Sequence, residues 1–191
     1  MIIHNESIVQ DYSQYNQDSD SNSIQDVAWS HDGTKLAYLV QTSASYGNTI
    51  HRDTISKSAN LYVASSSLTS PKLLTTNLSN AAAITWNVTN DKIAILEETE
   101  EHNGPGPGGF YFTPSIVIVD ANTGLEVQHI NLPSSTNIFV NECGFNCFPY
   151  RARIQWGTNG SFFLSYDNQG NTLVTSSGNV IPVLATWDIR S

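Results

Sequence analysis

Short apolar segments that alternate with polar turn residues run along most of the chain. The stretch AWSHDGTKLAYLV, residues 28–40, places a tryptophan-tipped segment and an apolar segment on either side of Asp32 and Gly33. Short apolar runs between turn residues predict β-strands joined by a hairpin. No segment has the apolar spacing of 3, 4 and 7 residues, with caps, that predicts a long helix. The pattern therefore predicts an all-β protein.

The hairpin pattern recurs twice more along the chain. VAWSHDGTKLAYLV, ITWNVTNDKIAILE and IQWGTNGSFFLSYD align on Trp29, Trp86 and Trp156. The position four residues after each tryptophan is Gly33, Asn90 or Gly160. Glycine and asparagine tolerate the positive φ of a tight turn, which explains their place here. The position seven residues after the tryptophan is Leu36, Ile93 or Phe163, and the alignment predicts that these three are equivalent.

Two further short strands follow each hairpin, so each repeat has four. A four-stranded unit repeated along a chain is typical of a β-propeller, in which neighbouring blades bury one another's faces. We expect a β-propeller-like array of four-stranded antiparallel blades within 24–191. The expected segments are an N-terminal strand or linker at 1–23, blades at about 24–80, 81–132 and 150–188, and a connector at 133–149 with an extra strand at NIFVN.

The first repeat resembles a known propeller motif. AWSHDGTKLAYLV is similar to the Trp-Ser-Pro-Asp-Gly repeat of TolB-type, WD-like β-propellers, which is also found in the propeller domains of prolyl-oligopeptidase-type peptidases. His31 stands where the repeat has proline, whereas Asp32 and Gly33 match it. The second and third copies match less of the motif. The resemblance implies the fold more than the function, because one fold hosts many functions.

Three recognisable blades are fewer than the four or more of ring-shaped propellers. Three arrangements would cover the end blades: the chain is a piece of a longer propeller, segments 1–23 and 133–150 form a fourth blade, or chains complete one another. We expect self-association, in which residues 2–10 add a strand to a neighbouring copy.

The charge of the chain narrows the choice of partners. Asp and Glu number 17 against 8 Lys and Arg, which gives a net charge of −9. A negative protein repels phosphate, so we expect neither nucleic acid nor an anionic membrane as a partner. No apolar run reaches the roughly 20 residues of a membrane span, and we expect no membrane insertion. The lysine-poor, Asn-, Ser- and Thr-rich composition favours an extracellular or periplasmic location, with a cytoplasmic one left open.

Two cysteines, Cys143 and Cys147, lie in the connector with C-x3-C spacing. They fit a local disulfide or two buried thiols. A zinc site needs two further ligands, and no nearby motif supplies them. We expect the disulfide to form in an oxidising compartment.

Two long insertions separate the second and third strands of the first two repeats. They are SASYGNTIHRDTISKS and ETEEHNGPGPGGFYFTP, and we expect them to be loops on one rim of the array. Long loops are commonly functional, and aromatic residues are enriched at binding surfaces. The candidate binding residues are Tyr46, Glu97, Glu98, Glu100, Glu101, His102, Phe110, Tyr111 and Phe112. The alternatives are aromatic residues that hold the loops down, a solvated strand end at 97–102, and cation ligands there.

No motif in the chain predicts catalysis. GPGPGG fits a nucleotide-binding pattern only formally, because it opens no helix and its prolines lack an N–H. No G-x-S-x-G motif occurs. We expect no catalytic residue, metal or cofactor, and a non-catalytic binding or assembly scaffold whose rim contacts a protein or a glycan. The alternatives are the propeller portion of a serine peptidase, inactive alone, and a structural subunit of an extracellular filament or surface layer.

Overall fold

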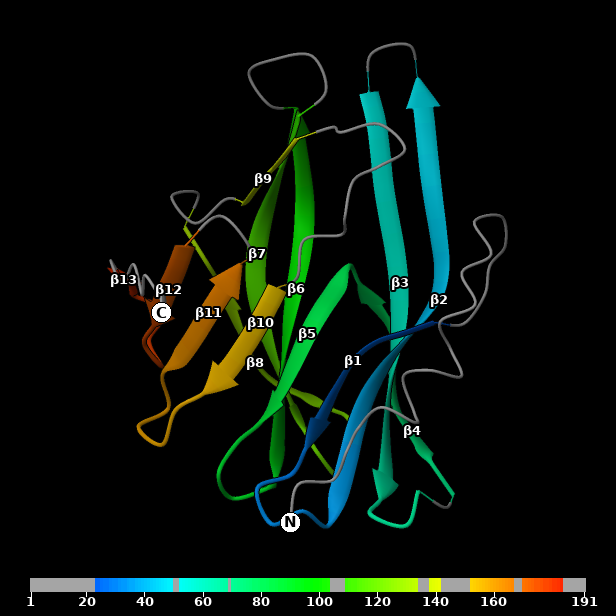
Figure 1. Ribbon diagram of the computed structural model, residues 1–191, viewed down its shortest axis with the longest axis vertical. Helices are drawn as coiled ribbons and strands as arrows, with labels where there is room; N and C mark the ends of the chain where they lie inside the picture. Colours follow the sequence, from blue (N-terminus) through cyan, green and yellow to red (C-terminus); the bar gives the residue numbers. More distant parts are fainter. Residues whose placement is uncertain are drawn as a thin grey trace, which may run out of the picture.

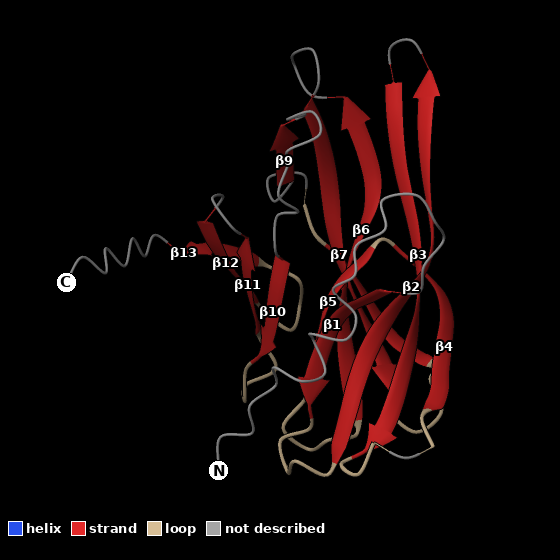
Figure 2. Cartoon of the chain, turned by 45° about the vertical axis from the view of Figure 1, so that its right-hand side comes forward, coloured by secondary structure: helices blue, strands red, loops and turns tan. Residues whose placement is uncertain are grey.

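The computed structural model describes residues 23–49, 52–68, 70–103, 109–133, 138–141, 152–166 and 170–183. Within 43–57, 98–112 and 138–141, and at 166, 170 and 182, only the course of the backbone is described. Every regular element in these ranges is a β-strand, and none is a helix, as Figure 2 shows. The prediction of an all-β fold is confirmed.

Three antiparallel sheets follow one another along the chain (Figure 1). Blade 1 contains β1 (Ser23–Trp29), β2 (Lys35–Thr49), β3 (Arg52–Ser65) and β4 (Lys72–Ser79). Blade 2 contains β5 (Ala81–Trp86), β6 (Lys92–Asn103), β7 (Gly109–Asp120) and β8 (Glu126–Asn131). Blade 3 contains β10 (Ala152–Trp156), β11 (Phe162–Tyr166), β12 (Gly170–Val174) and β13 (Val180–Val183). The array of four-stranded blades is therefore confirmed.

One further strand lies in the connector. β9 (Ile138–Asn141) pairs with β7 and so extends the sheet of blade 2. The strand predicted at NIFVN is thus present. It belongs to blade 2, so residues 138–141 do not contribute to a separate fourth blade.

The first turn of each blade is fixed by its polar residues. Gly33, Asn90 and Gly160 have φ values of 68°, 59° and 80°. This is the positive φ that glycine and asparagine tolerate, as predicted from their aligned positions. In the first turn, Asp32 Oδ1 accepts hydrogen bonds from the N–H of Thr34 across 3.0 Å and from the hydroxyl of Ser30 across 2.7 Å. These local bonds replace ladder bonds where the chain reverses, which explains why the turn residues repeat.

The third hairpin departs from the sequence alignment. Trp29 pairs with Leu36, and Trp86 pairs with Ile93, but Trp156 pairs with Phe162. The predicted equivalence of Phe163 is wrong, because the third turn is one residue shorter after its glycine. The shift by one residue exchanges the two faces of the strand, so Phe162 is buried and Phe163 is 37% exposed.

The core consists of two clusters, one on each side of blade 2. One cluster joins blade 2 to blade 1 through residues such as Leu39, Leu61, Ile95 and Val117. The other joins blade 2 to blade 3. Alternate side chains of β6 enter the two clusters, which explains why KIAIL reads as one continuous apolar run.

The two long insertions are strands and not the loops that we expected. β2 and β3 stay paired as far as Thr49 and Arg52, and β6 and β7 stay paired as far as Asn103 and Phe110. Both hairpins have a register shift of one residue, at Thr42 and at Thr99. These two threonines lie at the same distance from Trp29 and Trp86. The parts beyond them, 43–49 with 52–58 and 100–103 with 109–113, are named arm 1 and arm 2.

Candidate binding site

The two arms project from the same end of the molecule (Figure 1). A β-bulge at the base of each arm, at Thr42 and Thr99, bends the strand and increases its twist. At the base of arm 1, Thr42 Oγ1 donates to the carbonyl of Ser58 across 3.2 Å. The expectation that the insertions share one rim is therefore met, with hairpins in place of loops.

Arm 2 brings most of the candidate residues onto neighbouring strands. Glu101 pairs with Phe112, His102 pairs with Tyr111, and Glu100 pairs with Thr113. β9 lies on the other side of β7, where it pairs with residues 109–112. Arm 2 is thus a three-stranded ribbon along part of its length, which is stiffer than an isolated hairpin.

Tyr46 lies apart from this group. It belongs to arm 1, where it pairs with Ile55. The side chains of Tyr46, Glu98, Glu100, Glu101, His102 and Phe110–Phe112 lie outside the described residues, as do Cys143 and Cys147. Their roles in binding and in a disulfide therefore stay predictions.

Glu97, at the base of arm 2, is the one candidate binding residue whose side chain is described. It is 6% exposed, so the expectation of a solvated strand end is wrong at this residue. Burial raises the pKa of Glu97 to about 7, against the lowering effect of the Ser79 N–H that donates to its carboxyl group, and the Glu126 carboxylate raises the pKa further. Glu97 pairs in register with Ser115, whose buried hydroxyl has no hydrogen-bond partner within the described part.

Glu97 is a buried carboxyl group that is neutral below about pH 7, which does not suit a cation ligand. It faces the same side of β6 as Ile93 and Ile95, toward blade 1, and the N–H that it accepts belongs to the end of β4. No group of three His, Cys, Asp or Glu side chains that could hold a metal ion occurs where side chains are described. Residue 97 thus joins the base of arm 2 to blade 1.

The turns at the other end of the blades carry exposed carboxylates that are held ionised. Hydrogen bonds from the N–H of Thr34, the hydroxyl of Ser30 and the hydroxyl of Thr34 lower the pKa of Asp32 to about 2. The pKa values of Asp91 and Asp120 are lowered by donors in their own turns, chiefly Thr89 and Thr123. These carboxylates stabilise turns, which accounts for them without a ligand.

Sequence reasoning missed a set of polar contacts between blades 1 and 2. Asp26 Oδ2 accepts the N–H of Ile84 across 2.8 Å, and Asn90 Oδ1 accepts the N–H of His31 across 2.7 Å. Burial raises the pKa of Asp26, which the N–H of Ile84 opposes. The only signal in the sequence was an acidic residue inside the strand segment SIQDVAW.

The comparisons with known proteins show a likeness to solved structures and to no family model or curated protein. No family model matches the chain, and no curated protein matches it. Among solved structures the chain is similar to TolB from Acinetobacter baumannii, a β-propeller protein, with 15% identity and a TM-score of 0.46. The match covers 86% of this chain and 33% of that protein, so the chain spans about a third of its length.

The structure describes no helix that is long and apolar enough to cross a membrane.

Proposed function

We propose that this chain is a non-catalytic binding scaffold in which arm 2 makes the principal contact with a protein or glycan partner. The observation that carries the proposal is the continuation of β6 and β7 past the Thr99 bulge, with β9 beside them. A ribbon paired in this way presents its residues on a stiff support, which lowers the entropy lost on binding.

The composition of arm 2 supports a recognition role. Acidic residues and a histidine lie at 100–102, and three aromatic residues lie opposite them at 110–112. Aromatic side chains supply most of the energy at many interfaces, and acidic residues select a partner by charge. The acidic residues favour a partner with a basic surface over an anionic one.

A photo-crosslinking experiment tests this role of arm 2. A photoreactive residue at position 111 should crosslink to a specific protein in an extract of the source cells, whereas the same residue at position 125 should not. Leu125 is 68% exposed in the turn between β7 and β8, at the end of β7 opposite to arm 2. For a glycan partner, a glycan array probed with the intact chain replaces the extract.

Shortening each arm in turn distinguishes the contribution of arm 2 to binding from that of arm 1. Replacement of residues 99–113 by Asn-Gly joins Glu98 to Pro114, which are register partners, through a two-residue turn. The matched control replaces residues 42–58 by Asn-Gly and joins Gln41 to Ala59. We expect the first variant to bind the crosslinked protein or the glycan at least about tenfold more weakly, and the control to bind within about threefold of the intact chain. Unchanged affinity after the loss of arm 2 would remove the proposal.

We also place this scaffold outside the cytoplasm, in the periplasm or extracellular space. The lysine-poor surface and the two closely spaced cysteines support this location. Cys143 and Cys147 should then resist alkylation in the native, non-reduced protein and react after reduction. Two thiols that react without reduction in freshly isolated protein would argue against both the disulfide and the location.

Self-association is the second part of the proposed function. Assembly is favoured by the sheet faces at the two ends of the array, which blade 2 does not cover. In this proposal the end faces serve assembly and the arms serve the partner, so the two parts can be tested at different residues.

A further inference from the structure

The two interfaces between blades have the same direction along the chain. Trp86 packs in the cluster that blade 2 shares with blade 1, and Trp156 packs against the cluster that blade 3 shares with blade 2. The indole N–H of Trp86 donates to the carbonyl of Ala28 across 2.9 Å, and the backbone N–H of Trp156 donates to Thr85 Oγ1 across 3.3 Å. Each tryptophan-bearing face therefore packs on the preceding blade.

Trp29 has the same position in blade 1 but lies on the side away from blade 2. It pairs with Leu36 as Trp86 pairs with Ile93. The adjacent residue Ala28 packs against the cluster shared with blade 2, and successive side chains of a strand point to opposite faces. Blade 1 thus has a tryptophan-bearing face with no preceding blade among the described residues.

This surface, the head face, is apolar and rich in aromatic side chains. One row crosses the sheet through Val27, Tyr38, Tyr62 and Leu73, and Trp29 lies in the next row. The rings of Tyr38 and Tyr62 stack with centroids 5.4 Å apart, and Leu73 is 45% exposed. Neither row contains a charged residue, which is typical of a sheet face that packs on another surface.

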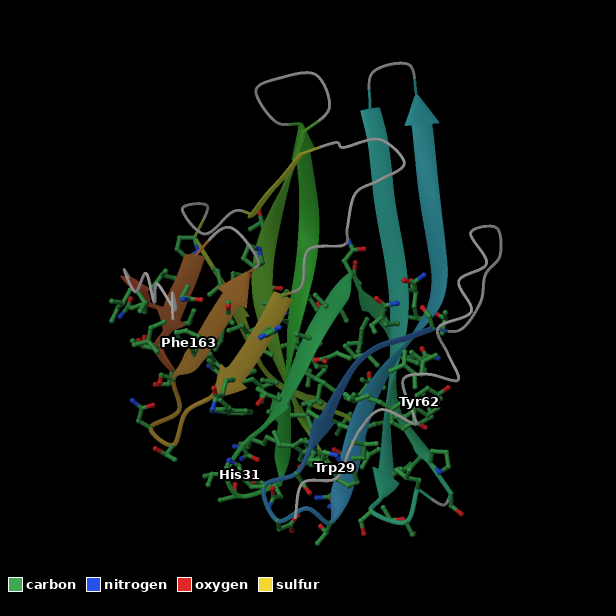
Figure 3. All side chains as sticks on the ribbon, in the orientation of Figure 1. Trp29, His31, Tyr62 and Phe163 are labelled. Carbon is green, nitrogen blue, oxygen red and sulfur yellow. The ribbon has the colours of Figure 1, made fainter. Side chains whose placement is uncertain are left out.

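Blade 3 has the complementary kind of surface, the tail face, on its side away from blade 2. One row contains Gln155, Phe163, Leu173 and Ile181. Phe163 is 37% exposed and Ile181 is 48% exposed. This is the side of a blade on which, in blades 1 and 2, the next tryptophan-bearing face packs. Figure 3 shows Tyr62 and Phe163 on opposite flanks of the molecule.

We propose that the head face of one copy packs on the tail face of a second copy, so that the chain assembles head to tail. Each face is one half of an interface that the molecule already makes twice, between blades 1 and 2 and between blades 2 and 3. Contacts between unlike faces repeat from copy to copy and generate a closed ring or an open array. This inference deepens the assembly part of the proposed function and rests on it.

The existing interfaces also favour unlike faces over a contact between two head faces. Trp86 needs the carbonyl of Ala28, which belongs to the first strand of the preceding blade and reaches it from that blade's tail side. A head-to-head contact would place two tryptophan-bearing faces together. Neither interface in the molecule joins two such faces.

Two substitutions that each damage one face test the arrangement. Tyr62→Asp puts a carboxylate in the head face, and Phe163→Asp puts one in the tail face. Sedimentation velocity over a concentration series should show association of the intact chain and at least about tenfold weaker association of each variant. An equal mixture of the two variants contains one intact head face and one intact tail face, and should form heterodimers that grow no further.

The mixture separates the proposal from its competitors. A head-to-head dimer would leave Phe163→Asp fully dimeric and would give no recovery on mixing. An intact chain that stays monomeric up to about 100 µM would overturn the proposal. Leu125→Asp, an exposed substitution outside both faces, should associate like the intact chain, and circular dichroism should show the same strand content in all variants.

The arms provide the readout that distinguishes the two parts of the proposed function. The Tyr62→Asp and Phe163→Asp variants keep both arms, so they should still crosslink through position 111. The chain with arm 2 shortened keeps both end faces, so it should still assemble. Loss of assembly with retained crosslinking, or the reverse, would show which part fails.

Discussion

A carboxyl group that is buried at the base of an arm links the protonation of one residue to the stability of the blades. The pKa of Glu97 is raised from 4.5 to about 7, chiefly by burial. Between these two values the folded state keeps a proton that the unfolded state has released. Glu97 therefore makes its full contribution to the free energy of unfolding below pH 4.5. This contribution falls as the pH rises and is lost above about pH 7.

Glu97→Gln should remove this dependence, because the amide stays neutral at every pH. We expect the variant to match the intact chain near pH 4 and to be more stable than it at pH 8. Urea denaturation at intervals of pH measures the difference. Curves for the two proteins that run parallel from pH 4 to pH 8 would show that Glu97 does not titrate in this range. The turn carboxylates do not interfere, because the pKa values of Asp32, Asp91 and Asp120 are lowered and their effects lie at more acidic pH.

Substitution of two glycines with positive φ distinguishes the cost of backbone strain from the cost of a steric clash. Gly33 has a φ of 68° and open space where a Cβ would be added, whereas Gly124 has a φ of 76° and its added Cβ would overlap the carbonyl of Leu74 in β4. Gly33→Ala should cost about 1 kcal/mol from strain alone. Gly124→Ala should cost clearly more, because the turn after β7 would have to move away from blade 1. Equal costs in urea denaturation would mean that the contact between the turn and β4 is not tight.

At the scale of single residues, turn conformations can be predicted from the sequence, whereas burial by a neighbouring blade cannot. The positive φ of Gly33, Asn90 and Gly160 could be predicted because it depends only on the turn. The burial of Glu97 could not be predicted, because nothing near Glu97 in the sequence shows that β4 covers it. Its neighbours in EETEEH are polar, and a polar run predicts a solvated strand end.

At the scale of single elements, the third hairpin shows how one residue changes a face. Phe162 is 1% exposed and its ring contacts that of Trp156 in a tilted arrangement with centroids 4.8 Å apart, whereas Phe163 is 37% exposed. Phe162→Ala should destabilise the protein by about 3–5 kcal/mol, as expected for a fully buried aromatic residue. Phe163→Ala should cost about 1 kcal/mol or less in dilute protein. A larger loss of stability for Phe163→Ala than for Phe162→Ala would support the register of the sequence alignment instead.

The reason that the alignment failed is geometric. In FF both residues are apolar, so the pattern of apolar positions fits either register. The register is set by the turn, in which Gly157 N–H donates to Ser161 O, whereas the first turn spans one residue more, from Ser30 to Lys35. The arms were misread for a related reason. Their sequences lack the regular alternation of apolar and polar residues that predicts a strand, so the pattern indicated loops.

At the scale of the whole molecule, blade 2 has an interface on both faces and blade 3 has one on a single face among the described residues. Stability in repeat proteins is approximately the sum of the stability of each unit and of its contacts with neighbours. Blade 2 should therefore be the last part to open. The sequence predicted three blades but not this difference, because each repeat has a similar apolar pattern.

Hydrogen exchange tests this order with two matched positions. Ile95 and Leu164 both lie in the second strand of their blades and are both 0% exposed, so their local burial is the same. In dilute protein the amide of Leu164 should exchange at least about tenfold faster than that of Ile95, because blade 3 can open while blades 1 and 2 stay packed. Raising the protein concentration should slow exchange at Leu164 and leave Ile95 unchanged, since a second copy would cover the tail face. Equal rates in dilute protein would mean that the three blades open as one cooperative unit.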